Sequence, residues 1–224
     1  MKIEKMKVDL IDYMGTDLTV VNSARVSFDK ESDWELQGES FEGHKHVLSE
    51  KDAKLINYLA KHNHWTCFGH CFAQFRISAP IFVARQLVKH QVGLVWNEVS
   101  RRYVDYEPSF WFPDTWRGRP TGSMKQGSSG TAPVQSQDTA KTSCEVSLKA
   151  YNELLELGVA PEQARMVLPL NSMTEWYWSG SLAAWARVCK LRLDAHAQEE
   201  TREVALLINE KMSQIFPVSW KALI

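Results

Sequence analysis

One short segment, from Arg85 to Tyr103, concentrates side chains that could bind an anion. Its charged residues are the cations Arg85, Lys89, Arg101 and Arg102 and the carboxylate Glu98. Arginine together with amide and hydroxyl donors suits a phosphate, because such hydrogen bonds are charge-assisted and often bidentate. Apolar residues are interleaved, so we expect much of the segment to be buried, and buried charge needs a partner or a ligand. The residues alone leave open a ligand site or a structural network of ion pairs.

The composition of the whole chain limits the partners of this segment. The 224 residues include 26 Lys and Arg against 27 Asp and Glu, which gives a formal charge of −1. This balance excludes a strongly basic nucleic-acid coat and an acidic disordered tail. The local excess of positive charge therefore predicts small anionic ligands. The apolar fraction of 44% is ordinary for a globular domain, and a chain of this length can bury a core without disulfide or metal staples.

The cysteines and the first residues indicate the compartment. Four cysteines in a chain of this size favour a reduced environment over a disulfide framework. Met1 to Lys5 carries charges where a signal peptide would need an apolar stretch. The apolar runs are too short to span a bilayer. We therefore expect a cytoplasmic protein with no membrane partner.

Periodicity predicts the elements that position the segment. Short apolar stretches favour strands between Val8 and Val21. A capping box at Ser49 begins a predicted helix that runs to about His62. Strict alternation from Cys71 to Ile77 predicts a half-buried strand. Pro80 suits the first turn of a helix that runs to His90.

The second half of the chain reads mainly as helix. Gly, Ser, Thr and Pro are frequent in residues 117–142, which predicts a flexible loop. A helix ending at Gly158 and a short one opened by Pro161 follow. Ser181 to Ile215 predicts one long helix with Arg192 and His196 on one face. Strands and helices mix without a regular β-α-β rhythm, so we expect one α+β domain over residues 1–224, with helices on a mainly antiparallel sheet.

The polar segment also matches a known pattern. It reads Arg85-Gln86-x-x-Lys89-His90-Gln91 and then Asn97-Glu98-x-Ser100-x-Arg102-Tyr103. This pattern resembles the signature of the flavin-dependent thymidylate synthases, with Lys89 and Gln91 standing where the family has arginines. Further matching blocks follow the family order: Thr66 to His70, Ala79 to Gln86, Ala164-Arg165, Leu168 to Asn171, and then Leu191-Arg192, Asp194 and His196-Ala197-Gln198.

The resemblance implies a fold, a reaction and an assembly. The fold would be the α+β domain of that family. The family converts dUMP to dTMP, with methylenetetrahydrofolate as the carbon donor. NADPH reduces FAD, and the reduced flavin supplies the hydride. Members are homotetramers whose active sites are shared between subunits.

The resemblance also assigns roles to residues. The residues for dUMP are Arg85, Gln86, Lys89, Glu98, Ser100, Arg101, Arg102, Arg165 and Arg192. Arg192 is the expected catalytic residue, because a guanidinium stays protonated while it stabilises an anion developing on the uracil ring. The residues for FAD are Thr66, Lys89, His90, Gln91, Glu98, Ser181, Leu182, Ala183 and Arg187. His64 and His70 match histidines near the flavin.

Two other functions fit parts of the sequence. A nucleic-acid-binding module would use the four cations of the polar segment and the tryptophans as a stacking groove, but the neutral total charge opposes it. A structural zinc site would use histidines and cysteines between His62 and Cys71. The spacing of Cys67 and Cys71 favours core cysteines, so we expect no metal. The cluster Trp176 to Trp178 is more typical of packing than of flavin stacking.

Overall fold

A four-stranded sheet runs along the length of the molecule. The computed structural model describes residues 1–37, 45–120 and 127–224. In sheet order, the strands are β2 (Lys7–Met14), β5 (Phe72–Pro80), β10 (Met173–Ser181) and β6 (Leu94–Glu98). Each neighbouring pair is antiparallel. The predicted α+β fold with a mainly antiparallel sheet is confirmed.

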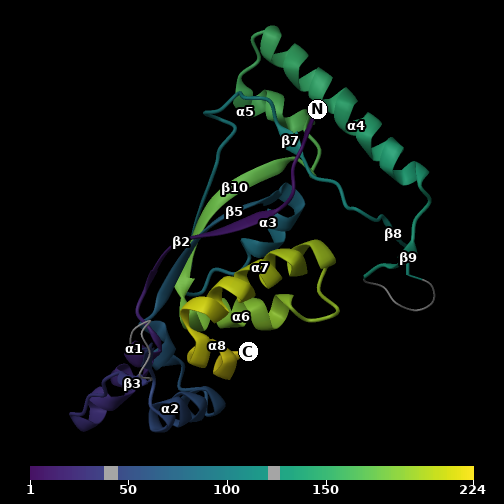
Figure 1. Ribbon diagram of the computed structural model, residues 1–224. Helices are drawn as coiled ribbons and strands as arrows, with labels where there is room; N and C mark the ends of the chain where they lie inside the picture. Colours follow the sequence, from purple (N-terminus) through teal and green to yellow (C-terminus); the bar gives the residue numbers. More distant parts are fainter. Residues whose placement is uncertain (38–44, 121–126) are drawn as a thin grey trace.

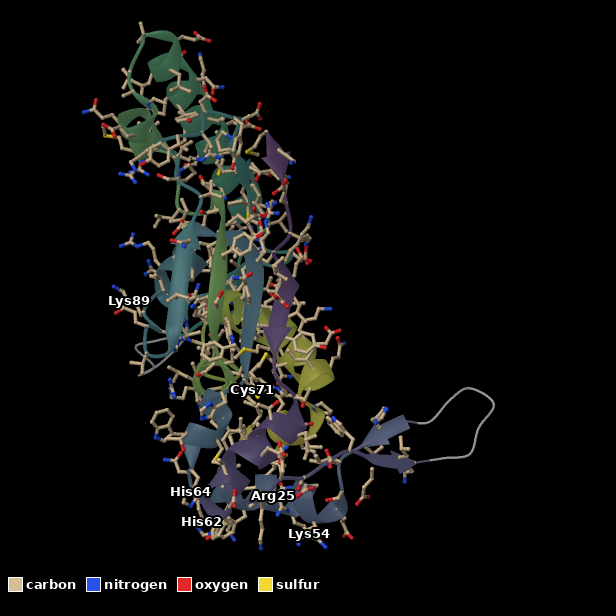
Figure 2. All side chains as sticks on the ribbon, turned by 90° about the vertical axis from the view of Figure 1, so that its left-hand side faces the viewer. Arg25, Lys54, His62, His64, Cys71 and Lys89 are labelled. Carbon is tan, nitrogen blue, oxygen red and sulfur yellow. The ribbon has the colours of Figure 1, made fainter. Side chains whose placement is uncertain are left out.

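Helices pack on one face and at both ends of the sheet. In chain order they are α1 (Asp17–Arg25), α2 (Glu50–Lys61), α3 (Ile81–Leu87), α4 (Gln135–Glu156), α5 (Pro161–Ala164), α6 (Leu182–Arg192), α7 (Glu199–Ile215) and α8 (Pro217–Leu223). Figure 1 shows α6, α7 and α8 beside the sheet, α4 and α5 at one end, and α1 and α2 at the other. The view in Figure 2 looks onto the opposite face of the sheet, where the strands lie in front of these helices.

Short elements connect these larger ones. The small strands pair as β1 (Lys2–Ile3) with β7 (Ser109–Phe110), β3 (Glu35–Gln37) with β4 (Lys45–Val47), and β8 (Arg117–Gly118) with β9 (Ser129–Thr131). The 3-10 turns are η1 (Val26–Phe28), η2 (Trp65–Gly69) and η3 (Arg165–Val167).

The main core lies between the sheet and α6. The predicted alternation of β5 is confirmed, since Ala73, Phe75 and Ile77 are buried. Trp185 of α6 packs edge-on against Phe75 and Trp178, with ring centroids 4.9 Å and 4.8 Å apart. Its indole nitrogen donates a hydrogen bond to the carbonyl of Ala73 at 3.1 Å. These contacts attach α6 firmly to the sheet.

The prediction for residues 8–21 is only half right, because β2 ends at Met14 and α1 begins at Asp17. The backbone N–H of Thr16 donates to the hydroxyl of Thr19 at 3.0 Å, which supports the start of α1. The Asp17 carboxylate is buried and accepts from the backbone of Val218 and Ser219 at 2.9 Å and 2.8 Å. Polar residues at a helix start override a weak strand pattern here.

The next two helix predictions agree better with the structure. Ser49 caps α2 as predicted, its hydroxyl accepting from the N–H of Asp52 at 3.1 Å. Pro80 precedes α3, but the helix ends at Leu87 and not at His90. The chain turns there and returns as β6 through Gly93, whose φ of +73° suits a residue without a side chain.

Residues 117–142 are not one flexible loop. Part of that prediction, residues 121–126, lies outside the described residues, but the flanks form the β8–β9 pair and α4 begins at Gln135. The indole of Trp116 donates to the side-chain oxygen of Gln137 at 2.5 Å. Cys144 and Leu148 bury one side of α4 against Phe110 and Phe112. These long-range contacts extend the helix further toward its N-terminus than composition predicts.

The predicted long helix from Ser181 to Ile215 is wrong. It divides into α6 and α7, with a turn from Leu193 to Gln198 between them. The Asp194 carboxylate accepts from the N–H of His196 at 2.7 Å, and the Asp194 carbonyl accepts from Ala197 at 2.9 Å. Aspartate offers the backbone an alternative to helical hydrogen bonds, which is why the helix breaks here. Arg192 and His196 therefore do not share a helix face.

Candidate active site

A cavity of about 850 Å³ lies among α3, the β8–β9 hairpin and the turn between α6 and α7. Its lining residues are Gln86, Arg117, Gly127, Ser128, Arg192, Ala195, His196, Ala197, Gln198, Glu199 and Arg202. They include three arginines but one carboxylate. Amide and hydroxyl groups add hydrogen-bond donors, so the cavity suits a small anion with polar edges.

Two predicted site residues, Gln86 and Arg192, meet in this cavity although they lie far apart in sequence. The Nε of Arg192 donates to Nε2 of His90 at 2.9 Å. An arginine only donates, so this nitrogen of His90 must be an acceptor and the imidazole neutral. The fold thus brings the end of α6 against the turn that follows α3.

Electrostatics agree with this hydrogen bond. Burial lowers the pKa of His90 below its ordinary value, and the neighbouring charge of Arg192 lowers it further. Burial also lowers the pKa of Arg192 itself, although a guanidinium remains protonated at any working pH. The cavity therefore holds a fixed positive charge beside a neutral imidazole.

Most of the residues predicted for FAD surround the turn between α3 and β6. Arg187 donates to the carbonyl of Val92 at 2.7 Å, and Ser181 caps α6 by accepting from Ala184 at 3.3 Å. Lys89 and Gln91 are exposed on the same turn, whereas Leu182 and Ala183 are buried in α6. The turn after α3 is thus held against α6 by Arg187, with Lys89 exposed on it.

The residues Ser100, Arg101, Arg102 and Arg165 lie elsewhere in the chain. β6 begins at Leu94 opposite Gly180, next to α6, and ends at Glu98 opposite Trp176. Ser100 therefore lies beyond the strand end that is remote from α6, and Arg165 lies in η3, beside α5. Figure 1 shows α5 next to α4 at one end of the molecule, away from the connection between α6 and α7. One chain does not bring these residues to Arg192.

The Ser100 turn satisfies much of its own polarity. Ser100 Oγ accepts from the backbone N–H and Nε of Arg102 at 3.3 Å and 3.2 Å. Arg101 donates to the carbonyl of Tyr106 at 2.9 Å and lies over its ring, 5.0 Å from the centroid. Arg165 Nε donates to the carbonyl of Glu162 at 3.2 Å. These cations face no carboxylate among the described ion pairs.

Two further predicted residues lie outside the Arg192 cavity. Glu98, at the end of β6, accepts from the Thr174 hydroxyl at 2.7 Å and from the Trp96 indole at 3.3 Å. Thr66 is exposed on η2, which packs against α1 and α6. Neither lines the cavity of Arg192.

The prediction that much of the polar segment is buried is wrong for this chain. Val92 and Val95 are 79% and 69% exposed. β6 is an edge strand, and the sheet face seen in Figure 2 is open there. Tyr177 on the neighbouring strand is exposed as well. Alternating apolar residues on an edge strand predict burial that a single chain does not provide.

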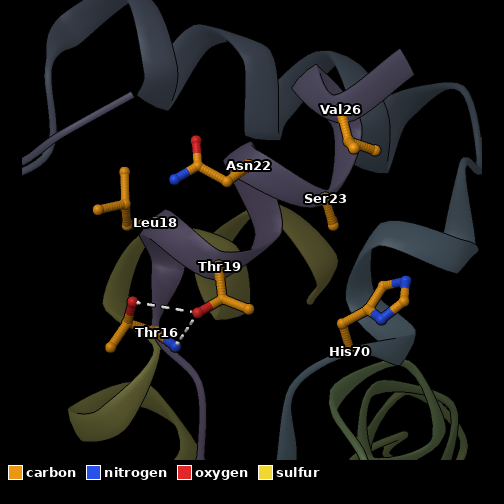
Figure 3. A pocket seen from close by; sticks show the side chains of 7 residues that line it. All are labelled: Thr16, Leu18, Thr19, Asn22, Ser23, Val26 and His70. Atoms are coloured by element: carbon orange, nitrogen blue, oxygen red, sulfur yellow. Dashed lines mark hydrogen bonds between the residues drawn. The ribbon is translucent and has the colours of Figure 1, made fainter. Parts of the chain in front are cut away.

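A second cavity, of about 490 Å³, lies between α1 and the end of η2. Figure 3 shows its lining side chains: Thr16, Leu18, Thr19, Asn22, Ser23, Val26 and His70. His70 belongs to a block that matches the family, and the fold brings it to one cavity with Asn22 of α1. Its walls offer hydroxyl, amide and imidazole groups for hydrogen bonds.

Several cavity residues were missed by sequence reasoning. Gln198 lies in a matching block, which is a signal that could have identified it. Arg117 lies in the segment predicted as a flexible loop, and Arg202 follows the break in the predicted long helix. Arg117 and Arg202 reach the cavity because α7 packs against α3 and β8, a contact that the sequence does not predict.

The cysteines and the tryptophans contribute mainly to the core. Cys67, Cys71, Cys144 and Cys189 are free and buried, and burial raises the pKa of both Cys71 and Cys189 to about 12. Trp176 and Trp178 are also buried, as the packing interpretation predicts. Figure 2 shows His62 and His64 at the end of the molecule, below Cys71. Among the described residues no three His, Cys, Asp or Glu side chains are grouped to hold a metal ion.

None of the helices in the described parts of the chain is long and apolar enough to cross a membrane.

Comparisons with known proteins agree with this architecture. The family model described as thymidylate synthase complementing protein matches residues 9–218. The flavin-dependent thymidylate synthase of Thermosipho africanus is 36% identical, covering 98% of this chain and 91% of that protein. The enzyme of the same name from Thermus thermophilus is also 36% identical, covering 98% of this chain and 76% of its own.

A solved structure has the same fold. The UMP/dUMP methylase PolB from Streptomyces cacaoi, bound with 5-Br dUMP, superposes with a TM-score of 0.83 and 28% identity. The match covers 99% of this chain and 96% of that chain. The α+β fold and the arginine-lined cavity thus define an enzyme of the nucleotide methylase class. The chain belongs to the thymidylate synthase complementing protein family, the flavin-dependent thymidylate synthases.

Proposed function

We propose that this methyltransferase converts dUMP to dTMP by reductive methylation, with methylenetetrahydrofolate as the carbon donor and FAD reduced by NADPH as the hydride source. The observation that carries the proposal is the cavity joining Gln86 to Arg192. Arg117 is paired with Glu199 and Glu200, but Arg192 and Arg202 form no ion pair among the described residues, so the cavity suits an anionic nucleotide. The substrate analogue named for the Streptomyces cacaoi methylase is a brominated dUMP, which supports the same ligand class.

In this proposal Arg192 is the catalytic residue. Its Nε is held by His90 at 2.9 Å, so the remaining guanidinium N–H groups are available to a ligand in the cavity. A positioned cation stabilises negative charge that develops on the uracil ring without releasing its own proton. His90 would act by fixing the direction of that cation.

The phosphate of dUMP would contact residues from two separate parts of the structure. Gln86 would donate a hydrogen bond from the Arg192 cavity. The other phosphate contacts would come from Ser100, Arg102 and Arg165, which lie outside that cavity. Arg85, Lys89, Glu98 and Arg101 complete the proposed set. Planar guanidinium groups suit a phosphate because they donate two parallel hydrogen bonds.

The residues present fit a flavin dinucleotide. Lys89 and Arg187 place positive charge along the turn after α3 for a pyrophosphate, and His90, Gln91 and Ser181 add polar contacts. Thr66, Glu98, Leu182 and Ala183 complete the proposed surface. Bound FAD, once reduced by NADPH, would supply the hydride. The chain's residues would orient the dinucleotide and exclude water from it.

We propose that the active sites are shared between subunits of a homotetramer. Arg165 and the Ser100 turn do not line the cavity of Arg192, so in this proposal a complete phosphate site needs a second copy. Val95 and Tyr177 on the open face of the sheet are exposed apolar residues that a second copy could cover.

The proposal also covers the organisation of the chain. Residues 1–224 form a single catalytic domain. Four free, buried cysteines support a reduced compartment such as the cytoplasm. Its ligands would be small anions, not nucleic acid or membrane.

The flavin spectrum, recorded with and without dUMP, tests the proposal. The purified protein should bind FAD and turn yellow, and its absorbance should change when dUMP is added. It should also oxidise NADPH in a dUMP-stimulated way and form dTMP from methylenetetrahydrofolate. A protein that takes up no FAD on reconstitution would contradict the proposal.

A further inference from the structure

A chain of hydrogen bonds joins α3, α7 and β8 at one wall of the large cavity. Thr201 Oγ1 donates to Gln86 Oε1 at 2.8 Å, and Gln86 Nε2 donates to Gln198 Oε1 at 2.5 Å. Gln198 Nε2 then donates to Glu200 Oε2 at 3.0 Å. Arg117 donates to the other oxygen of Glu200 at 2.7 Å. Every donor in the chain points toward the carboxylate.

The chemistry of Glu200 dictates this direction. Glu200 is buried and forms an ion pair with Arg117, and both of its carboxylate oxygens accept hydrogen bonds, from Arg117 and from Gln198. Gln198 must therefore present its N–H to Glu200 and its carbonyl to Gln86. Gln86 must in turn present an N–H to Gln198. Neither amide can flip without placing two acceptors against each other.

The hydrogen bond from Thr201, at the other end of this series of hydrogen bonds, restricts Gln86 in the same way. Thr201 is fully buried, and its hydroxyl finds the Gln86 carbonyl as an acceptor. Gln86 thus has its carbonyl and one N–H already engaged, which leaves one N–H for a ligand. Aligned hydrogen bonds also polarise one another, which strengthens the last donor.

We propose that Glu200 and Thr201 are positioning residues that fix the Gln86 amide with an N–H, and not its carbonyl, toward the bound nucleotide phosphate. The proposal rests on the proposed function, in which Gln86 contacts dUMP. A glutamine free to flip would offer its carbonyl to the anion in part of the population. Arg117 holds the Glu200 carboxylate in place through their ion pair, and its second ion pair, to Glu199 at 3.0 Å, connects β8 to α7.

The variant Glu200→Gln separates positioning from simple charge effects. It removes a negative charge beside an anion site, so electrostatics alone predicts tighter binding of dUMP. Positioning predicts weaker binding of dUMP. The neutral amide of the new glutamine can pair with the Gln198 amide in either of its two orientations, so the Gln86 amide is no longer held in one orientation. The two explanations therefore differ in the sign of the effect.

The matched control is Glu203→Gln. Glu203 lies on the same helix and takes no part in the hydrogen bonds that join Thr201, Gln86, Gln198 and Glu200. Its substitution removes the same negative charge. Isothermal titration of the FAD-loaded protein with dUMP should give a Kd raised about tenfold for Glu200→Gln, the effect of losing a charge-assisted hydrogen bond. Glu203→Gln should leave the Kd within about twofold.

Thr201→Val tests the other hydrogen bond that orients Gln86, because it removes the hydroxyl and keeps the shape of the side chain. We expect its Kd for dUMP to rise about threefold. In turnover, Glu200→Gln and Thr201→Val should both raise KM for dUMP, while kcat and KM for NADPH stay near wild type. General damage to the fold would not produce this split.

The outcomes distinguish this inference from the proposed function. If the wild-type protein binds dUMP, and Glu200→Gln and Thr201→Val both bind it as tightly or more tightly, the positioning role is wrong. If the wild-type protein does not bind dUMP, the proposed function fails and the inference fails with it.

Discussion

The two groups of residues proposed for the phosphate differ in how a single chain supports them. Gln86 and Arg192 are held by partners remote in sequence, namely Thr201 and His90. The turn that begins at Ser100 forms its hydrogen bonds within itself, over separations of two to five residues. One group is built by tertiary packing and the other by local contacts.

This difference indicates what each group needs to bind a ligand. Residues fixed by packing are already oriented, so binding costs little conformational entropy. An exposed turn must be ordered when the ligand or a second copy of the chain covers it. The difference fits an active site in which one copy supplies the oriented cavity and another supplies the turn.

The largest expected effect concerns the core that supports the cavity. Trp185→Ala should lower the free energy of unfolding by about 3–5 kcal/mol, because it removes the ring between Phe75 and Trp178. Tyr103→Ala, in the turn, removes a side chain that is already 78% exposed and should change stability by less than about 0.5 kcal/mol. Urea denaturation of both variants measures the difference. Equal losses would show that the turn is supported as strongly as the cavity.

The next prediction concerns activity. Arg192→Ala and Arg165→Ala should each lower the rate of dTMP formation by about 10²–10³-fold, the cost of removing a charged group that stabilises or binds the reacting anion. Co-expression of the two variants should restore about one quarter of wild-type activity, since random assembly pairs one intact residue of each kind at that frequency. If both residues served the same site within one chain, the mixture would remain inactive.

Elements with local signals were predictable from the sequence. The alternation of β5 and the Ser49 cap of α2 identify a strand and a helix because each is decided by neighbouring residues. The break at Asp194 was missed because a side-chain hydrogen bond to the backbone competes with helix periodicity. The start of α4 was missed because Trp116 stabilises it from outside the helix, through its hydrogen bond to Gln137.

The site shows the same division. Motif resemblance identified Gln86 and Arg192, whose roles remain proposals, and the fold brings them to one cavity. Arg117 and Glu200 carry no motif, and their relation to Gln86 depends on α7 packing against α3 and β8. Networks that cross three elements in this way leave no spacing pattern in the sequence.

The third prediction concerns pH and the contact that orients Arg192. The pKa of His90 in the folded state is lower than its ordinary value of 6.5, so the unfolded state binds more protons as the pH falls below that value. The contribution of His90 to stability is therefore complete above the ordinary pKa and is lost as the pH falls toward the folded pKa.

His90→Gln tests this sign. Between about pH 7.5 and about pH 5.5, the wild-type free energy of unfolding should fall more than that of the variant, because glutamine does not titrate. Urea denaturation at each pH gives the difference, and an NMR titration of the His90 ring gives its pKa directly. An identical pH dependence of the two proteins would mean that His90 is not held neutral by Arg192.

The smallest effect is expected for Ser100→Ala. Among the described residues the hydroxyl accepts only from Arg102, in its own turn, so the free energy of unfolding should change by less than about 0.5 kcal/mol. KM for dUMP should nevertheless rise about fivefold, because a donor to the phosphate is lost. Ser109→Ala is the matched control, since its hydroxyl donates to Glu4 at 3.1 Å and no ligand role is proposed for it. A rise in KM for Ser100→Ala alone, with equal stability, would show that a turn need not support the fold to contribute to binding.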